Sequence, residues 1–345
     1  MRLALAVLPV VVAAASAAQP LKPKVVVVST FEIGADTGDK PGEFQLWVER
    51  ENLGQPLSLP SLSRPARLST NGVLGVVSGT TVRAATEIMA LGLSPELDLS
   101  MSYWLVNGIA GVDPADASVG SAAWALNVID GDIAYEIDSR DVPPHWPYGL
   151  VPIGGKKPNV INEDATWAPK PMAWNLNAGL VHWAFNLTKD TPIPDSDAAR
   201  AHRALYLDHE AARRPASVLL GDSLGSCRYW HGRAMTQWAN DWTRLHTAGH
   251  GNFVMTNMED HGIAHALQRL AALRKVDFNR VLFLRTGSNF CTPAPGKSAA
   301  DSMTEEYSGM TPALEAAHRV GSRVVRELVS GWSQYQGQIP SSPRP

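Results

Sequence analysis

The chain has 345 residues, of which 45% are hydrophobic and 18% charged, a composition typical of a folded globular protein rather than a disordered one. Its formal net charge of −3 and pI of about 6.4 argue against nucleic acid or an anionic membrane as a partner. Any anion that this protein binds must therefore be held locally, by a loop or a helix end.

The first 18 residues have the features of an export signal peptide. Arg2 supplies a short positive start, residues 3–12 an apolar core, and residues 15–17 a small-residue cleavage pattern. The prolines at 20 and 23 would break a continuing buried helix. We expect cleavage near residue 17 or 18 and a periplasmic or extracellular location. No later stretch approaches the roughly 20 apolar residues that cross a bilayer, so no direct membrane span is expected.

Strand-like and helix-like segments alternate along the rest of the chain. Residues 24–30 (KVVVVST) form an apolar, β-branched run that is typical of a strand buried on both faces. The other predicted strands lie at 73–78, 101–109, 122–137 (with a turn at 130–131), 217–220, 252–256 and 280–284. The predicted helices lie at 43–51, 82–91, 198–213, 233–246, 259–273 and 312–332. This alternation predicts an α/β fold with a largely parallel or mixed sheet.

We expect a single domain over residues 22–335, because no linker divides it. The stretch at about 143–195 is rich in Pro, Trp and Asn and predicts a loop-rich insertion over the sheet. The polar residues 336–345 predict a flexible tail. Cys227 and Cys291 would form either one disulfide in an oxidising compartment or two free thiols, and the sequence leaves both open.

Open α/β sheets bind ligands at the carboxyl ends of their strands, and three such junctions carry candidate residues. The first is VVSGTTVRAA at residues 76–85. The backbone N–H groups of its loop, with the hydroxyls of Ser78 and Thr80, can hold an anion or a ribose, and Gly79 provides the turn. The alternative is an ordinary helix start capped by a threonine.

The second junction is VMTNMEDHGIAHAL at residues 254–267. The carboxylate of Glu259 can accept hydrogen bonds from two sugar hydroxyls, and Met258 can pack against the apolar face of the sugar. Simple helix capping is the alternative for Glu259. His261 and His265 have the spacing of a metal-binding pair, but no further ligand is evident, so we expect two structural histidines and no metal site.

The third junction is VLFLRTGSNF at residues 281–290, a buried strand that we expect to end at its Gly-Ser-Asn. Ser288 and Asn289 lie at its tip, and an amide that both donates and accepts suits a purine edge carrying N7 and a 6-oxo group. An Asx-type turn is the alternative. Farther upstream, Tyr229, Trp230 and His231 follow another strand and would either stack on a base or fill the core.

In this order the motifs resemble the purine nucleoside permease family, which is similar to the nucleoside phosphorylase and nucleosidase superfamily. The resemblance runs from about residue 24 to residue 331. TNMEDHG at 256–262 and LRTGSNF at 284–290 are its specific parts, while VVVVSTFE, SGTTVRAA and VNGIAG (106–111) are more generic. It implies a three-layer α/β/α nucleoside phosphorylase-like fold with a central mixed β-sheet.

The resemblance also assigns roles to individual positions. Met258 and Glu259 match the pair that holds the ribose. Asn289 matches the polar residue at the base, which is Asp in many relatives and Asn in those that prefer 6-oxopurines. Ser78 and Gly79 match the loop on the side of the anion or water, and Gly108 to Gly111 match the turn under the base.

Two features of the superfamily have no clear counterpart. Nucleosidases carry carboxylates after the first strand that position the attacking water, and the nearby candidates for this general base are Glu32, Asp36 and Asp39. Phosphorylases clamp phosphate with arginines, for which Arg83 and Arg285 are the candidates.

The function implied is an exported purine-nucleoside-binding protein that cleaves the N-glycosidic bond. Either water or phosphate, as a co-substrate, would attack, and no cofactor is expected. The alternative is a non-catalytic nucleoside-binding component that assists transmembrane transport by a separate transporter. A homo-oligomer in which a neighbour completes each site stays open.

Overall fold

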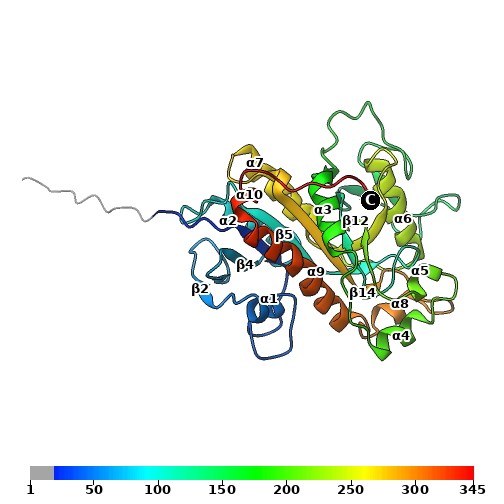
Figure 1. Cartoon of the computed structure of the whole chain (residues 1–345). Helices are drawn as coiled ribbons and strands as arrows, with labels where there is room; N and C mark the ends of the chain where they lie inside the picture. The colour runs from blue at the N-terminus through cyan, green and yellow to red at the C-terminus, as the bar shows by residue number, and fades with distance from the viewer. Residues whose placement is uncertain (1–18) are drawn as a thin grey trace, which may run out of the picture.

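A computed structural model describes residues 19–345 of the chain (Figure 1). Residues 1–18, where the sequence predicts a signal peptide, lie outside the described part. Within residues 19–345, twelve strands join in one mixed sheet and two further short strands pair with each other.

The strands are β1 (Val25–Ser29), β2 (Gln55–Leu57), β3 (Ala66–Leu68), β4 (Val73–Val77), β5 (Tyr103–Val112), β6 (Ala122–Trp124), β7 (Asn127–Asp130), β8 (Ala134–Glu136), β9 (Leu150–Pro152), β10 (Ala173–Asn175), β11 (Val218–Leu220), β12 (Asp222–Gly225), β13 (Phe253–Asn257) and β14 (Val281–Phe290). The helices are α1 (Gln45–Arg50), α2 (Val82–Leu93), α3 (Ala178–Thr188), α4 (Asp197–Arg203), α5 (Glu210–Arg213), α6 (Arg233–His246), α7 (Asp260–Ala272), α8 (Ala299–Met303), α9 (Met310–Ser330) and α10 (Trp332–Tyr335), with a 3₁₀ turn η1 at Phe278–Arg280.

The long strand β5 is the centre of the sheet and changes its partner partway along. On one edge it pairs with β14 over nearly its whole length. On the other edge it pairs in parallel with β1 up to Val106 and antiparallel with β13 from Gly111 onward. The described chain places no strand beside residues 107–110 on that edge. The sheet therefore has a gap in its hydrogen-bond ladder beside the middle of β5.

Helices cover the sheet and confirm the predicted α/β/α fold with a central mixed sheet (Figure 1). The amphipathic helix α9 packs along β5 and β14, whereas α7 packs against α2 and against β7 and β12. Glycines allow close contacts between these layers, because a Cβ at Gly321 would lie 3.0 Å from side-chain atoms of Leu105 and Trp47. All five residues of β1 are buried, as the β-branched run predicts.

Several elements differ from the sequence prediction. Strands β5 and β14 continue through their glycines to Val112 and Phe290, because neighbouring strands pair with them there. The single helix predicted at 198–213 is two short helices, α4 and α5. Strand β12, in a segment for which the sequence predicted neither helix nor strand, pairs with both β7 and β13.

The stretch at 143–195 and the C-terminal segment are tied to the domain. Strand β10 of that stretch pairs with β7 at the edge of the sheet, and α3 packs against α9. In the expected tail, the backbone N–H of Ser342 donates a hydrogen bond to the carbonyl of Gly179 at 3.0 Å. A search of the helices within residues 19–345 finds none that combines the length and the apolar character needed to cross a membrane.

Candidate functional site

A pocket lies beside the middle of β5, where β1 and β13 diverge. The space that it encloses, part of it open to solvent, is about 690 Å³. The lining residues are Thr30, Phe31, Glu43, Thr80, Ile109, Ala110, Gly111, Arg228, Tyr229, Trp230, Thr256, Asn257, Met258, Glu259, Ser288, Asn289, Cys291 and Tyr307.

Glu43 fills part of the gap in the ladder with its carboxylate. Its Oε2 accepts hydrogen bonds from the backbone N–H and the hydroxyl of Thr30, both at 2.7 Å. Its Oε1 accepts the N–H of Ile109 at 2.7 Å, a donor of β5 beside the gap. Burial raises the pKa of Glu43 even though the charge of Arg285 and these hydrogen bonds oppose the rise. The site thus holds a carboxylate with increased basicity, placed by the segment just before α1.

Gly108 is needed for this arrangement. A Cβ at this position would collide with Oε1 of Glu43 and lie 2.6 Å from Nη1 of Arg285. The sequence predicted a turn under the base at this position, but Gly108 lies within strand β5. Because glycine has no side chain, the buried carboxylate of Glu43 and the buried guanidinium of Arg285 can both lie next to it.

Glu259 is the second buried carboxylate of the pocket. It occupies the N-cap position of α7 without a capping hydrogen bond from its side chain, and its carboxylate lies 2.9 Å from Nη2 of Arg285. Burial raises the pKa of Glu259 to about 7, with the charge of Glu43 adding to the rise and that of Arg285 opposing it. The raised pKa favours the protonated carboxyl, and in that form Glu259 can donate to a sugar hydroxyl as well as accept from one.

A buried polar network positions Arg285. Its guanidinium also contacts Asp260 through Nε at 3.1 Å and Nη2 at 2.5 Å, and its Nη1 donates to the carbonyl of Ile109 at 3.3 Å. Asp260 in turn accepts the hydroxyl of Ser223 at 2.6 Å and the amide of Asn257 at 3.0 Å. Since the side chains of Arg285, Asp260, Ser223 and Asn257 are all buried, the guanidinium is held by these protein partners and is not free to bind a phosphate.

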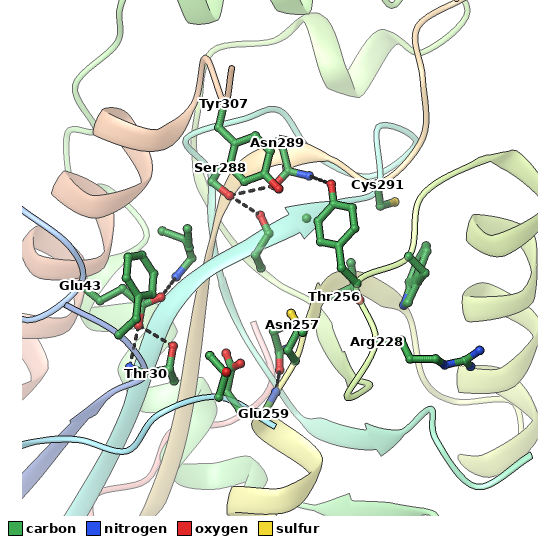
Figure 2. A pocket seen from close by; sticks show the side chains of 18 residues that line it. Thr30, Glu43, Arg228, Thr256, Asn257, Glu259, Ser288, Asn289, Cys291 and Tyr307 are labelled. Carbon is green, nitrogen blue, oxygen red and sulfur yellow. Dashed lines mark hydrogen bonds between the residues drawn. The ribbon is translucent and has the colours of Figure 1, made fainter. Parts of the chain in front are cut away.

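The opposite end of the pocket carries an amide and two phenols, as Figure 2 shows. The amide nitrogen of Asn289 donates to the hydroxyl of Tyr229 at 3.3 Å and to the carbonyl of Phe290 at 3.1 Å. Its oxygen accepts the hydroxyl of Ser288 at 2.9 Å. Burial raises the pKa of Tyr229, which keeps the phenol protonated and able to donate. This end can exchange hydrogen bonds with the edge of a planar base.

The pocket brings together eight of the residues predicted from sequence. These are Thr80, Gly111, Tyr229, Trp230, Met258, Glu259, Ser288 and Asn289. The loop before α2 is joined to this site by a hydrogen bond from the N–H of Thr81 to the carbonyl of Met258 at 3.1 Å. Thr81 itself has φ 59° and makes no capping bond with its side chain, unlike the alternative that the sequence allowed.

Other predicted residues lie outside the pocket lining. Ser78 is buried with its hydroxyl on the carbonyl of Gly79 at 3.0 Å, and His231 lies 3.1 Å from the hydroxyl of Ser302. Gly79, with φ 74°, forms the turn of its loop. Arg83 is exposed on α2 and does not line the pocket.

The carboxylates considered as general bases have structural partners instead. Glu32 accepts backbone N–H groups of Phe44 at 2.7 Å and Gln45 at 2.5 Å, and so fixes the loop before α1. Asp36 pairs with Arg64 at 2.7 Å and Arg67 at 2.8 Å, away from the pocket lining. Asp39 accepts the N–H of Ala35 at 2.9 Å and is exposed.

Glu43 is the pocket carboxylate that the sequence reasoning did not select. The sequence predicts only the start of a helix there, since the general-base candidates that follow the first predicted strand lie at residues 32, 36 and 39. One signal was present: Glu43 stands four residues before Trp47 and so shares its apolar helix face. A carboxylate on such a face needs a buried partner or a function.

The cysteines are both free, with Cys227 half-buried and Cys291 buried. His261 and His265 do not converge: His261 is buried, whereas His265 is exposed and packs edge-on against Trp174 at 5.9 Å between ring centroids. The two histidines therefore do not form a metal-binding pair with each other.

Comparisons with known proteins give a family and a fold. The model of the purine nucleoside permease family matches residues 22–340. A probable purine nucleoside permease of Schizosaccharomyces pombe is 30% identical over 258 residues, covering 73% of this chain and 74% of its own. The purine nucleoside permease of Candida albicans is 25% identical over 322 residues, covering 91% of this chain and 76% of its own.

Among solved structures, the futalosine hydrolase of Helicobacter pylori has a TM-score of 0.53 at 12% identity, covering 88% of this chain and 98% of its own. The 5′-methylthioadenosine/S-adenosylhomocysteine nucleosidase of the same organism, with a bound immucillin derivative, has a TM-score of 0.52 at 13% identity, also covering 88% of this chain and 98% of its own. At such identities the similarity shows a shared fold.

Proposed function

Because the chain belongs to the purine nucleoside permease family and has a nucleosidase-like fold, we propose that it binds a purine nucleoside in the pocket beside β5 and hydrolyses the N-glycosidic bond. We place this activity outside the cytoplasm, since residues 1–18 have the sequence of an export signal. The observation that carries the proposal is the buried Glu43 carboxylate facing the same cavity as Glu259 and Asn289.

The sugar would lie at the carboxylate end. Glu259 is suited to bind ribose hydroxyls because Arg285 fixes its position and its raised pKa allows both donation and acceptance. Met258 offers an apolar surface beside it. Positive charge builds up on the ribose as the bond to the base breaks, and nearby carboxylates stabilise that charge.

Glu43 would act as the general base. Burial raises its pKa, and Oε1, which accepts one hydrogen bond from Ile109, keeps a free lone pair, whereas Oε2 accepts two hydrogen bonds from Thr30. It takes a proton from a water that attacks C1′ while the bond from C1′ to N9 breaks and its electron pair passes to the purine. The purine takes its proton from solvent, because the amide of Asn289 can donate a hydrogen bond but cannot release a proton.

Water is favoured over phosphate as the nucleophile. Arg285 is paired with Asp260 and Glu259, and Arg83 lies outside the pocket lining. Arg228, at the rim, pairs with Glu136. A phosphate dianion placed beside two buried carboxylates would be repelled without a free cation to offset the charge.

A binding component that assists nucleoside uptake is the second candidate. The matched relatives are named as permeases. In addition, the amide of Asn289 has no acidic proton to give to the departing purine, unlike a carboxyl at the same position. In this alternative the pocket binds the nucleoside and passes it intact to a separate transporter.

One experiment separates these candidates. The purified protein is incubated with inosine, guanosine and adenosine, with and without phosphate, and free base is measured by chromatography, while calorimetry measures binding. We expect phosphate-independent base release that falls at least about 100-fold in Glu43→Gln with nucleoside affinity changed by less than about threefold. Glu49→Gln, an exposed change six residues later in α1, is the control and should retain the activity.

Binding without release, in both the parent protein and Glu43→Gln, would exclude the hydrolase and favour the transport component. Release that depends on phosphate would instead make the protein a phosphorylase and contradict the argument from the paired arginines.

A further inference from the structure

Three side chains from separate segments converge on one point next to the pocket. Asp132 follows β7, Cys227 follows β12, and His261 lies in the first turn of α7. Their ligand atoms all lie within 4.8 Å of one another. Nε2 of His261 is 3.0 Å from Oδ2 of Asp132 and 3.7 Å from Sγ of Cys227.

This geometry does not fit a nucleophilic Cys-His-Asp triad. In a triad the nucleophile contacts one ring nitrogen and the carboxylate contacts the other. Here both groups contact Nε2, while Nδ1 faces Gly225, where an added Cβ would lie 2.5 Å away. Burial and the Asp132 carboxylate also raise the pKa of Cys227 to about 12, which keeps the thiol protonated and unreactive at neutral pH.

We propose that Asp132, Cys227 and His261 form a binding site for a divalent transition-metal cation of the zinc type. A thiolate, an imidazole and a carboxylate together form a ligand set suited to Zn²⁺. Tetrahedral bonds of about 2.0–2.3 Å place ligand atoms about 3.3–3.6 Å apart, and the observed 3.0 and 3.7 Å lie within a few tenths of an ångström of those spacings.

The surroundings support a cation at this point. Asp132 is oriented by the hydroxyl of Ser226 at 2.8 Å and by the backbone N–H of Cys227 at 2.8 Å, as metal-binding carboxylates usually are. Asp130, two residues earlier, adds negative charge beside His261. Since Cys227 is only half-buried, solvent can supply a fourth ligand.

Binding would release protons. The metal displaces the thiol proton of Cys227, because only the thiolate is a ligand. The affinity for the metal should therefore increase with pH.

The metal would connect two chain segments that contribute residues to the pocket. Cys227 directly precedes Arg228 and Tyr229, which line the pocket, and His261 lies two residues after Glu259. A bound cation would hold the loop after β12 against the first turn of α7. This inference does not depend on the reaction proposed above, because a binding protein would gain the same rigidity.

The test uses the full chain after removal of metals with a chelator. Zn²⁺ affinity is measured by competition with a chromophoric chelator, and Co²⁺ is added to detect thiolate-to-cobalt charge transfer by absorption. We expect one Zn²⁺ per chain and a charge-transfer band in the parent protein. Cys227→Ser should lose the band and bind Zn²⁺ more than about tenfold less tightly.

His265→Gln, a change of the exposed histidine on the same helix, is the matched control and should keep both properties. If Cys227→Ser does not fold, Asp132→Asn serves instead and should keep the band with weaker affinity. Absence of stoichiometric Zn²⁺ binding in the parent protein would overturn the proposal. A band that survives in Cys227→Ser but vanishes in Cys291→Ser would overturn it as well.

Discussion

Replacing Glu259 by Gln should stabilise the fold at alkaline pH and have much less effect at acidic pH. Burial raises the pKa of Glu259 from 4.5 to about 7, so the folded protein favours the protonated carboxyl. The contribution of this group to stability is therefore complete below pH 4.5 and is lost as the pH rises through about 7. Glutamine keeps the shape and cannot ionise.

The size of the effect follows from the two pKa values. The difference between about 7 and 4.5 corresponds to roughly 3 kcal/mol when the group is fully ionised. Most of this loss falls between pH 5 and pH 8, because the two pKa values enclose most of that range. The free energy of unfolding of Glu259→Gln, relative to the parent, should thus increase by roughly 2–3 kcal/mol between these two pH values.

Urea unfolding followed by tryptophan fluorescence measures this difference, since the chain has 11 tryptophans. The exposed Glu163→Gln is the control and should show no comparable change between pH 5 and pH 8. A Glu259→Gln variant whose relative stability is the same at both pH values would refute the burial argument. A variant that is less stable than the parent at pH 8 would show that ion pairing with Arg285 outweighs burial.

Three further results are expected. Gly108→Ala should destabilise the protein by about 1–3 kcal/mol in urea unfolding and impair nucleoside binding, because the added Cβ collides with Glu43. The control is Gly54→Ala, whose added Cβ meets no atom within 4 Å and should not have this effect. Asn289→Asp should shift the preference from 6-oxopurine towards 6-aminopurine nucleosides by at least about tenfold in competition binding, because a carboxylate accepts from the amino group; an unchanged ratio would place the base elsewhere. Tyr229→Phe removes the hydroxyl that accepts from the Asn289 amide and should weaken nucleoside binding by about 1 kcal/mol, roughly fivefold, by calorimetry; full affinity would count against this contact.

Local patterns in the sequence predicted those helices and strands whose formation depends mainly on their own residues. Helix α6 has the bounds that the periodicity predicts, and the apolar run of β1 is buried throughout. The family resemblance likewise drew attention to Glu259 and Asn289, which the structure brings into one pocket.

The features that the sequence did not predict depend on contacts between distant segments. Strands β5 and β14 continue through their glycines because each pairs with the other on both sides of those glycines, with one shift of register between Gly287 and Asn289. Glu43 reaches the pocket because the loop of residues 31–42 folds back, held by Glu32. No rule based on spacing from the first strand could place this carboxylate in the site.

The pairing of β5 with β14 also determines when the pocket can form during folding of the chain. The hydroxyl of Ser288 donates to the carbonyl of Ala110 across 178 residues, and closing such a large loop is slow. During synthesis the pocket cannot form until the segment carrying β14 has left the ribosome, long after β1 and α1. In refolding experiments, helical circular dichroism should therefore recover before nucleoside-binding capacity does.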